Sequence, residues 1–398
     1  MKLPFQNLAS SFDVNAIQAT IQRALASAGL DTRSGPLHDV TETIRRALGA
    51  GHPEATARAT DHASVIDVAA RVVPDGQDAD AAGAREPLIG KAPPRPGRFE
   101  AHEYSNQAGS RSYKLYVPAG PSDAPRPVIV MLHGCTQSAD DFAAGTQMNR
   151  LADEHGFLVV YPEQSAQANP TKCWNWFRPQ DQVRGAGEPS LIAGIVGEVV
   201  QRHAADPRRV HVAGLSAGAA MAVVMGETHP ELFAGVGVHS GLPFGSAHDI
   251  PSAMAAMKGG RSSMPRARQA ADAAGTAPKT ALQAVPVIVF HGDRDHTVQL
   301  TNGEHIVQQA LQARGAQGTG GTLRESTEAG VASGGRRFTR TVHTDSEGHA
   351  HIESWTLHGA GHAWSGGHAS GSYTDATGPD ASAEMVRFFL ALPRTASC

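Results

Sequence analysis

The residues GLSAG at positions 214–218 set a serine between two glycines, in the spacing G-x-S-x-G. The short strand-like run Val210–Ala213 precedes them, and small residues that suit a helix follow them. Gly214 and Gly218 have no Cβ, so the chain can turn sharply there and bring the strand close to the helix. This strand–turn–helix context predicts a nucleophile at Ser216, lifted to the tip of the turn with its Oγ exposed, rather than an ordinary tight turn.

A serine hydroxyl is a weak nucleophile at neutral pH, so it needs a general base and a carboxylate that orients the base. A predicted strand that ends at Phe290 is followed by the loop HGDRDHTV. In this loop Asp295 lies far enough from the strand to bend back toward a histidine, whereas Asp293 is better placed to cap the turn through backbone N–H groups. We therefore expect Asp295 to be the acid, with Asp293 as the alternative.

The base is expected in the loop HGAGHAW, which follows a predicted strand that ends at Leu357. His362 lies in the glycine-flanked part of this loop, while His358 is closer to the strand and less free to reach the serine. We therefore predict His362 as the base and keep His358 as the alternative. Three further histidines surround a predicted hairpin: His343, His349 and His351. With no cysteine or spaced carboxylate beside them, we expect these three to face solvent and to form no metal site.

Acyl transfer also requires hydrogen-bond donors for the negative oxygen that develops on the carbonyl. The backbone N–H of Ala217, the residue after the nucleophile, is the first expected donor. The second is expected from the loop LHGCTQ at 132–137, which follows the predicted strand Val128–Leu132. Gly134 lets the backbone turn inward in this loop, so the N–H of Cys135 is the second candidate.

Three cysteines are too few for a disulfide scaffold. Cys135 and Cys173 both fall near the predicted site, and the sequence leaves open whether they form a disulfide or remain buried thiols. Cys398 ends the chain and is expected to be a free thiol.

The stretch CWNWF at 173–177 packs three aromatic residues into five positions of a chain that is only 5 % aromatic. These side chains either anchor the loop in the core or form an apolar wall of a substrate cleft, faced by Trp364. Trp174, Trp176 and Trp364 are therefore the predicted substrate-binding residues.

Strands and helices must position these residues, and the two alternate from Phe99 onward in the manner of a mostly parallel sheet. The predicted strands, beside the one before the serine, are Tyr113–Val117, Val128–Leu132, Phe157–Tyr161, Ala234–Val238, Val285–Phe290 and Ile352–Leu357. The first alternates and is expected to be an antiparallel edge strand, whereas the continuous apolar runs suit central strands covered on both faces. The predicted helical segments are Leu191–His203, Ala381–Leu392 and a flap over the site mouth between Gly245 and Ala284. Arg184–Pro189 is expected to order the loop before a helix, with no catalytic role for Glu188.

The order serine, aspartate, histidine, each after a strand, predicts an α/β-hydrolase fold for residues 99–398. Residues 1–73 contain two predicted amphipathic helices, after Asp13 and Asp39, and are expected to form a helical extension. This extension packs on the main domain or joins two copies of the chain in a homodimer. Its polar faces are not rich in Lys or Arg, which argues against a membrane-surface role. Residues 74–98 are rich in Ala, Asp, Gly and Pro and are predicted to be a linker.

The composition narrows the class of protein. With 398 residues, of which 40 % are hydrophobic and 18 % charged, the chain resembles a globular enzyme. The net charge of −4 gives no basic surface, so nucleic-acid binding is not expected. No apolar run has the length of a membrane span, and the first residues show no apolar core of a secretion signal.

Taken together, the motifs LHGCTQ, CWNWF, GLSAG, HGDRD and GHAWSGG resemble those of the polyhydroxybutyrate depolymerase family of esterases, of the short-chain-length type, with relatives among feruloyl and acetylxylan esterases. The resemblance spans the chain from Phe99 to Leu392 and implies the triad Ser216, Asp295 and His362, in agreement with the choice made from the residues. Family members that erode solid polyester usually carry a secretion signal and a C-terminal polymer-binding domain, and neither is visible here. We therefore expect action on soluble or amorphous oligomers and short esters rather than on crystalline polymer.

The sequence thus predicts a serine esterase, without metal or cofactor, that acts on short-chain carboxylic esters or on poly- and oligo(3-hydroxyalkanoates). A carbohydrate esterase that removes feruloyl or acetyl groups is the alternative, because the same triad would serve it. An acyltransferase is a third reading. An interaction protein with an inactive catalytic domain is a fourth, and the complete triad argues against it. The family resemblance suggests an extracellular protein, whereas the N-terminus suggests a cytoplasmic one, so the compartment stays open.

Overall fold

The computed structural model describes residues 97–120, 122, 124–260, 284–316 and 322–393. The expected N-terminal helices and their dimer contact, nearly all of the linker, most of the predicted flap and Cys398 lie outside these residues.

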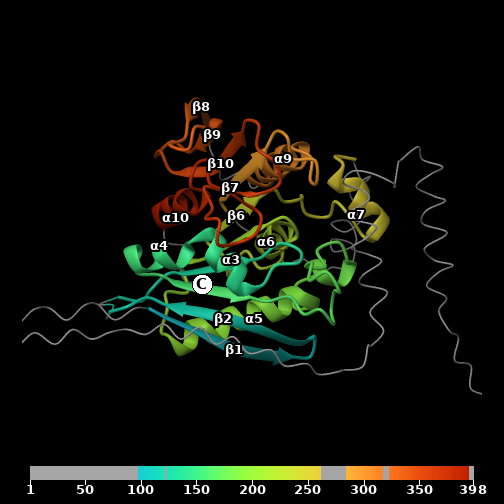
Figure 1. The fold of residues 1–398 in the computed structure, drawn as a ribbon, viewed down its shortest axis with the longest axis vertical. Coiled ribbons are helices and arrows are strands. Elements are labelled where there is room, and N and C mark those ends of the chain that lie inside the picture. Colours follow the sequence, from blue (N-terminus) through green and yellow to red (C-terminus); the bar gives the residue numbers. More distant parts are fainter. Residues whose placement is uncertain (1–96, 121, 123, 261–283, 317–321, 394–398) are drawn as a thin grey trace, which may run out of the picture. The chain divides into compact units, whose positions relative to one another are not determined.

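One large sheet organises the described part of the chain. Its ten strands follow the order β1-β2-β4-β3-β5-β6-β7-β10-β9-β8 (Figure 1). The strands are β1 (Arg98–Asn106), β2 (Gly109–Val117), β3 (Val128–Leu132), β4 (Leu158–Pro162), β5 (Val210–Leu215), β6 (Gly235–His239), β7 (Val287–Gly292), β8 (Arg324–Val331), β9 (Arg337–Thr344) and β10 (Ala350–Leu357). From β4 to β10 the neighbouring strands pair in parallel, and the pairings toward both edges are antiparallel. The sheet is therefore mixed and mostly parallel, as predicted.

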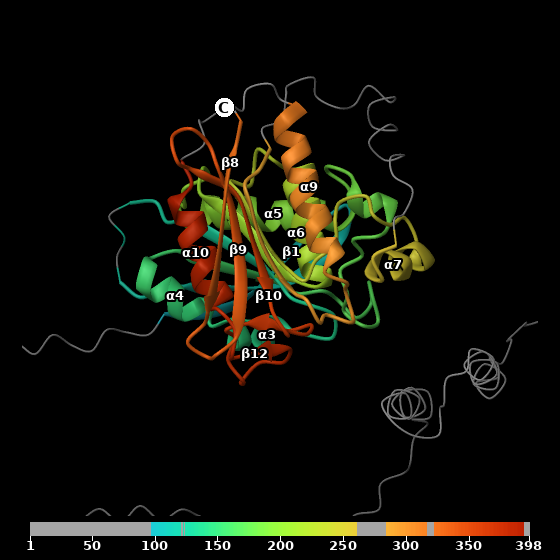
Figure 2. The same ribbon diagram turned by 90° about the horizontal axis from the view of Figure 1, so that it is seen from above.

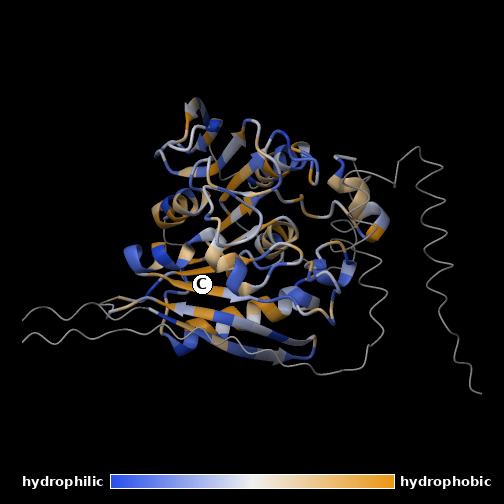
Figure 3. Cartoon of the chain, viewed as in Figure 1, coloured by the Kyte–Doolittle hydropathy of each residue, from blue (hydrophilic) through white to orange (hydrophobic). Residues whose placement is uncertain are grey.

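Helices cover both faces of the sheet. The helical elements are α3 (Ala139–Thr146), α4 (Met148–His155), the 3₁₀ turn η1 (Pro179–Gln182), α5 (Gly187–Arg202), α6 (Ala217–Thr228), α7 (Ile250–Met257), α9 (Thr301–Ala316) and α10 (Ala381–Ala391). Helices α5, α6 and α9 lie on one face, and α3, α4 and α10 lie on the other (Figure 2). Since both faces are covered, β3, β4, β5, β6 and β7 are buried at every position, which explains their continuous apolar runs (Figure 3).

The first edge of the sheet differs from the prediction. The run Tyr113–Val117 forms the second half of β2 and pairs antiparallel, as expected, but it is not an edge strand. Strand β1 covers it, in register from Arg98 opposite Val117 to Asn106 opposite Gly109. The sequence of β1, RFEAHEYSN, mixes polar and charged residues with few apolar ones, so no apolar run marks it as a strand.

The opposite edge also contains strands that the sequence did not predict. The residues of β8 are almost all exposed and those of β9 mostly half-buried, so neither strand carries a period-2 apolar pattern. The predicted last strand is β10, and two short strands follow it in residues 358–393, β11 (Trp364–Ser365) and β12 (Thr374–Asp375). The predicted helix Leu191–His203 corresponds to α5, which begins four residues earlier, at Gly187. Glu188 and Pro189, expected in the loop before the helix, therefore belong to its first turn.

Within the described residues, no helix combines the length and the apolar character needed to cross a bilayer.

Candidate active site

Ser216 lies at the turn between β5 and α6, in a backbone conformation that L-residues rarely adopt, with φ 57° and ψ −119°. Two backbone hydrogen bonds of 2.9 Å hold it there: its N–H donates to the carbonyl of His239 on β6, and its carbonyl accepts from Ala220 on α6. Strain of this kind persists only where the surroundings enforce it, and it is frequent at reacting residues. The turn is thus the sharp one that the sequence predicted.

The two glycines of the motif are required by close approach rather than by a positive φ. A Cβ on Gly218 would lie 2.0 Å from the carbonyl oxygen of Leu132 at the end of β3. A Cβ on Gly214 would lie 2.5 Å from the carbonyl group of Gly218. Because these neighbours are backbone atoms, no side-chain rotation relieves the clash. The glycines therefore let the start of α6 approach the carboxyl ends of β3 and β5.

Buried Asp295 and half-buried His362 form a hydrogen-bonded pair. The loop after β7 carries the aspartate, the loop after β10 carries the histidine, and Oδ2 of the former lies 2.7 Å from Nδ1 of the latter. Oδ1 of Asp295 accepts hydrogen bonds from the backbone N–H groups of Thr297 and Val298. The carboxylate therefore orients the ring, and Nδ1 is the nitrogen that carries the proton, which leaves Nε2 as the basic atom.

The protonation state of Asp295 suits this arrangement. Its side chain is 2 % exposed, and burial by itself raises the pKa of a carboxyl group. The hydrogen bond and charge of His362, with the N–H of Val298, outweigh burial and hold the pKa of Asp295 below its usual value. The carboxylate therefore stays ionised at neutral pH.

The structure assembles the acid and the base but not the contact with the nucleophile. Among the described residues, Ser216 Oγ has no hydrogen-bond partner, and the ring of His362 bonds only through Nδ1. Such contacts often form only when substrate binds.

The alternative pair, Asp293 and His358, lies on the same two loops. Oδ2 of Asp293 lies 3.0 Å from Nδ1 of His358, and its Oδ1 accepts the backbone N–H of Gly359. The aspartate thus bonds a backbone N–H, as expected, but one from the neighbouring loop rather than from its own turn. Nε2 of His358 is occupied by Thr339 Oγ1, at 2.8 Å. Because both of its ring nitrogens are engaged, His358 is poorly placed to act as a base.

The expected oxyanion donors have free backbone N–H groups in the described part of the chain. Gly134 N–H donates to Gln137 Oε1 at 2.9 Å, so it is occupied. The N–H groups of Cys135 and Ala217 have no acceptor among the described residues. His133 braces the same loop, because its Nε2 accepts the backbone N–H of Gln164 at 3.0 Å. Burial lowers the pKa of His133, so the ring is neutral and can accept this hydrogen bond.

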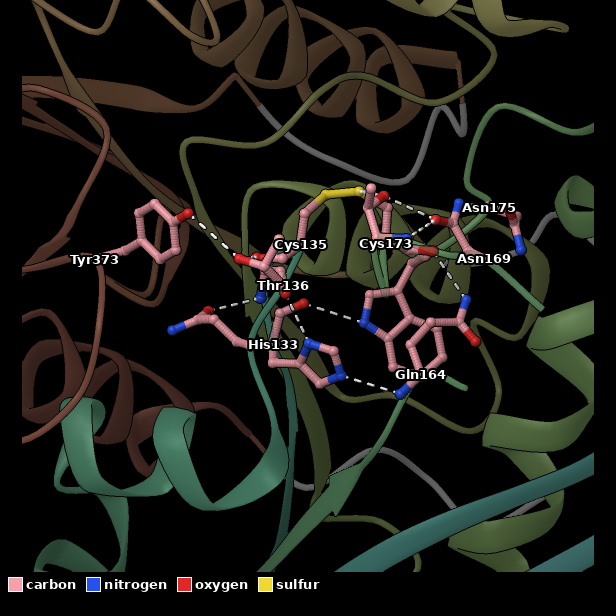
Figure 4. The surroundings of a disulfide bond; sticks show 12 residues. His133, Cys135, Thr136, Gln164, Asn169, Cys173, Asn175 and Tyr373 are labelled. Carbon is pink, nitrogen blue, oxygen red and sulfur yellow. Dashed lines mark hydrogen bonds between the residues drawn. A yellow bond between two sulfur atoms is a disulfide. The ribbon is translucent and has the colours of Figure 1, made fainter. Parts of the chain in front are cut away.

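A disulfide joins Cys135 to Cys173, which decides the question that the sequence left open (Figure 4). The bridge ties the loop after β3 to the loop that carries CWNWF. A hydrogen bond of 3.1 Å from Trp174 Nε1 to the carbonyl of His133 joins the same two loops. The backbone around the second candidate donor is therefore fixed from two sides.

The expectation that three tryptophans line a substrate cleft is wrong in this structure. Trp174, Trp176 and Trp364 are 0, 6 and 1 % exposed. Each is a core anchor: Trp364, for example, packs edge-on against Phe142 and donates its indole N–H to Ser382. The amphipathic indole ring satisfies both the core and a polar partner, so aromatic clustering alone did not distinguish an anchor from a cleft wall.

Glu188 organises the same region, a role that the sequence did not reveal. Its side chain is 4 % exposed and accepts hydrogen bonds from both the backbone N–H and the side chain of Asn175, each at 2.7 Å. Gln164 and Arg111 donate to it as well. The Glu188 carboxylate therefore fixes the CWNWF loop through Asn175, which is consistent with a structural role rather than a catalytic one.

The prediction of solvent-facing histidines near the hairpin is wrong for two of the three. His343 is 6 % exposed, and His351 bonds Asp345 at 2.7 Å and Arg314 at 2.8 Å. His343 lies on β9, which the sequence did not predict, and His351 lies on β10, one residue before the start of the predicted strand Ile352–Leu357. Nevertheless, the described residues contain no cluster of side chains suited to a metal ion.

Of the predicted flap, residues 245–260 and 284 are described, and they include helix α7. The carbonyl of Met257 accepts the N–H of Gln299, and Lys258 Nζ donates to the carbonyl of His296, both at 2.9 Å. The end of α7 therefore lies beside the loop of Asp295. A covering role for the flap stays a prediction.

Comparison with known proteins identifies a family and several relatives. The family described as "Esterase PHB depolymerase" matches residues 111–331, which include Ser216 and Asp295 and end before His362. The chain is 33 % identical over 268 residues to poly(3-hydroxyalkanoate) depolymerase C of Paucimonas lemoignei, covering 66 % of this chain and 61 % of the relative. It is 33 % identical over 155 residues to feruloyl esterase B of Thermothelomyces thermophilus, covering 39 % of this chain and 52 % of the relative. The chain thus spans between about half and three fifths of the length of these relatives.

A solved structure supports the fold. The acetyl xylan esterase from Aspergillus awamori superposes with a TM-score of 0.53 at 20 % identity, over 71 % of this chain and 94 % of the other. The described chain therefore has an α/β-hydrolase-like fold, with a mixed, mostly parallel sheet flanked by helices.

Proposed function

Because the chain belongs to the esterase PHB depolymerase family, we propose that it hydrolyses short-chain carboxylic esters or poly- and oligo(3-hydroxyalkanoates) through a serine acyl-enzyme. The observation that carries this proposal is the 2.7 Å hydrogen bond between Asp295 and His362, on loops at the same sheet edge as Ser216. Carboxyl ends of parallel strands meet at one edge, so the three loops converge there.

The proposed reaction uses three side chains and two backbone N–H groups of the candidate site. Nε2 of His362 takes the proton of Ser216 Oγ as the oxygen attacks the ester carbonyl, and Asp295 stabilises the imidazolium that forms. The N–H groups of Cys135 and Ala217 donate to the negative carbonyl oxygen. His362 then returns its proton to the leaving alkoxide, and the alcohol departs. In the second half, His362 takes a proton from water and the hydroxide attacks the acyl-enzyme. His362 then returns the proton to Ser216 Oγ as the bond to the acyl group breaks, and the carboxylic acid is released.

The substrate class follows from the relatives. The relative that covers the larger share of this chain is a poly(3-hydroxyalkanoate) depolymerase, which favours hydroxyalkanoate esters. The match to a feruloyl esterase favours a carbohydrate esterase as the second candidate, since the same three residues would carry out both reactions. Hydroxyalkanoate esters and feruloyl or acetyl esters differ only in the groups that flank the scissile ester bond.

A panel of esters tests the proposal. Initial rates are measured on p-nitrophenyl acetate, butyrate and octanoate, a 3-hydroxybutyrate oligomer and methyl ferulate, for the wild type and for Ser216→Ala. We expect the short esters and the oligomer to be hydrolysed, with rates reduced by about 10⁴-fold or more in the variant. Methyl ferulate as the best substrate would favour the carbohydrate esterase, and equal rates for wild type and variant would exclude a serine hydrolase.

A further inference from the structure

Two exposed residues beside the candidate oxyanion donor share an unusual backbone conformation. Thr136 has φ 67° and Tyr373 has φ 52°, and neither is a glycine. A left-handed conformation is unfavourable for a residue with a Cβ, and strain of this kind concentrates at functional sites. Tyr373 is also 48 % exposed, so its ring is not held in this position by burial in the core.

The two side chains meet at the rim of the oxyanion loop. Tyr373 Oη lies 3.3 Å from Thr136 Oγ1, and Figure 4 shows the phenol directed at the threonine, next to the disulfide. Thr136 Oγ1 uses its own proton in a 2.6 Å hydrogen bond to the carbonyl of Cys135. The threonine hydroxyl is therefore the acceptor in this contact, and the phenol is the donor. The contact is long for two hydroxyl groups, so a better acceptor can replace it at little cost.

Tyr373 also adjoins the loop of the candidate base. Its backbone carbonyl accepts the N–H of Trp364, at 2.7 Å, and Trp364 is two residues after His362. Tyr373 thus contacts the loop that presents the proposed oxyanion donor through its phenol, and the loop that presents the proposed base through its backbone.

The segment that carries Tyr373 is held firmly against α3. Ser372 donates both its N–H and its hydroxyl to Asp141, at 2.9 and 2.6 Å, and Gln137 donates to the carbonyl of Ser372. Gly371 packs against Gly145 so closely that a Cβ would lie 2.4 Å from the Gly145 backbone. These contacts fix the backbone before Tyr373 and leave its ring free to meet a ligand.

We propose that Tyr373 and Thr136 form a subsite for a second ester group of an oligoester substrate, next to the ester that is cleaved. The phenol of Tyr373 donates a hydrogen bond to the carbonyl of the neighbouring monomer, in place of its contact with Thr136, and the ring packs against the aliphatic chain. Tyr373 thereby becomes the aromatic substrate contact that the sequence had assigned to buried tryptophans. This inference rests on the proposed function, because it concerns the specificity of the same site.

A comparison of one-ester and multi-ester substrates tests the subsite. KM and kcat are measured for the wild type, Tyr373→Phe and Tyr373→Ala on methyl 3-hydroxybutyrate and on the linear 3-hydroxybutyrate trimer. Loss of one neutral hydrogen bond is expected to raise KM for the trimer about fivefold in Tyr373→Phe, and loss of the ring to raise it by about tenfold or more in Tyr373→Ala. The kcat for the trimer, and kcat/KM for methyl 3-hydroxybutyrate, are expected to stay within about twofold of the wild type.

The variant Tyr373→Gly separates binding from stability. Glycine adopts φ 52° without strain, so Tyr373→Gly is expected to melt about 2 °C higher than Tyr373→Ala. Both variants are nevertheless expected to lose the same affinity for the trimer. A KM that follows the melting temperature instead would show that Tyr373 acts only by supporting the loop, and would overturn the subsite.

The remaining outcomes are distinguishable. Equal losses on the trimer and on methyl 3-hydroxybutyrate, or an unchanged KM for the trimer, would overturn the subsite while leaving the esterase proposal intact. A wild type that cleaves neither substrate any faster than Ser216→Ala would overturn both.

Discussion

At the scale of the residue, Asp293 and Asp295 lie only two positions apart and each forms a hydrogen bond to a histidine. The two pairs differ in burial. The Asp295 side chain is fully buried and leaves Nε2 of His362 unoccupied, whereas Asp293 lies at the surface and His358 has both ring nitrogens bonded. A buried carboxylate interacts more strongly with a developing imidazolium than an exposed one, because water screens the exposed pair. The geometry therefore favours Asp295 and His362 over Asp293 and His358 as the catalytic pair.

This difference gives a matched pair of variants. We expect Asp295→Asn to lower kcat on p-nitrophenyl butyrate by about 10³-fold or more, because the amide no longer holds the ring with Nε2 free and unprotonated. The control, Asp293→Asn, keeps activity within about threefold. The reverse ranking in a steady-state assay would assign catalysis to Asp293 and His358.

The residues of the candidate site were predictable to different degrees. Ser216, Asp295 and His362 were chosen from local sequence, because each follows a strand and stands among glycines. Glu188 and Tyr373 were not recognised, since their roles depend on partners 13 and 237 positions away, Asn175 and Thr136. A single sequence carries no sign of such pairing.

At the scale of the element, the junction of β3, β5 and α6 is the most constrained part of the fold. The start of α6 approaches β3 so closely that only a hydrogen fits where Gly218 faces Leu132. Apolar runs located these buried strands within a few residues, because strands covered on both faces need continuous hydrophobicity. Strands β1 and β8 at the two ends of the described sheet, and β9 beside β8, lack that requirement, and so they escaped prediction.

Two glycine substitutions in helices test this constraint. We expect Gly218→Ala to destabilise the protein by about 3 kcal/mol or more and to abolish activity, because its Cβ would lie 2.0 Å from a backbone oxygen. The control is Gly197→Ala in α5, where nothing lies within 4 Å of the added Cβ. Alanine there is expected to stabilise the helix by about 0.5–1 kcal/mol. Urea unfolding measures both, and a tolerated Gly218→Ala would contradict the close approach.

The disulfide gives a second prediction at this scale. It closes a loop of 38 residues, and the chain-entropy treatment assigns about 4 kcal/mol to a loop of that length. We expect the double variant Cys135→Ala, Cys173→Ala to unfold at lower urea and to lose about tenfold in kcat, because the candidate oxyanion N–H is less firmly held.

Reduction provides the control for the disulfide. Dithiothreitol is expected to lower the activity of the wild type toward that of the double variant and to leave the double variant unchanged. A double variant with wild-type kcat would show that the bridge supports stability alone.

At the scale of the whole molecule, buried histidines couple the fold to pH. His211 and His239 lie fully inside the sheet region, and burial lowers the pKa of each to about 3. His211 stacks on Phe389, and neither of its ring nitrogens has a hydrogen-bond partner among the described residues. Each ring is therefore neutral in the folded protein and takes up a proton only on unfolding.

Acid stability follows from this coupling. The unfolded chain protonates His211 below about pH 6.5 and the folded chain only near pH 3, so the free energy of unfolding falls as the pH drops through this window. We expect His211→Leu to reduce the slope by about 1.4 kcal/mol per pH unit between pH 4 and 6. The exposed His248→Leu serves as the control for removing a histidine side chain. Urea unfolding at several pH values measures both, and parallel slopes for His211→Leu and wild type would contradict the prediction.

The exposed strand β8 bears on how separate molecules of the protein interact. In the described chain it forms one end of the ten-stranded sheet, and its outer backbone groups offer a template on which a strand of another molecule can add. Three charged residues stand along it: Arg324, Glu325 and Glu328. Charges on an open edge oppose such pairing, because an incoming strand would have to strip water from them. The charged side chains of β8 thus oppose association between molecules through their sheet edges.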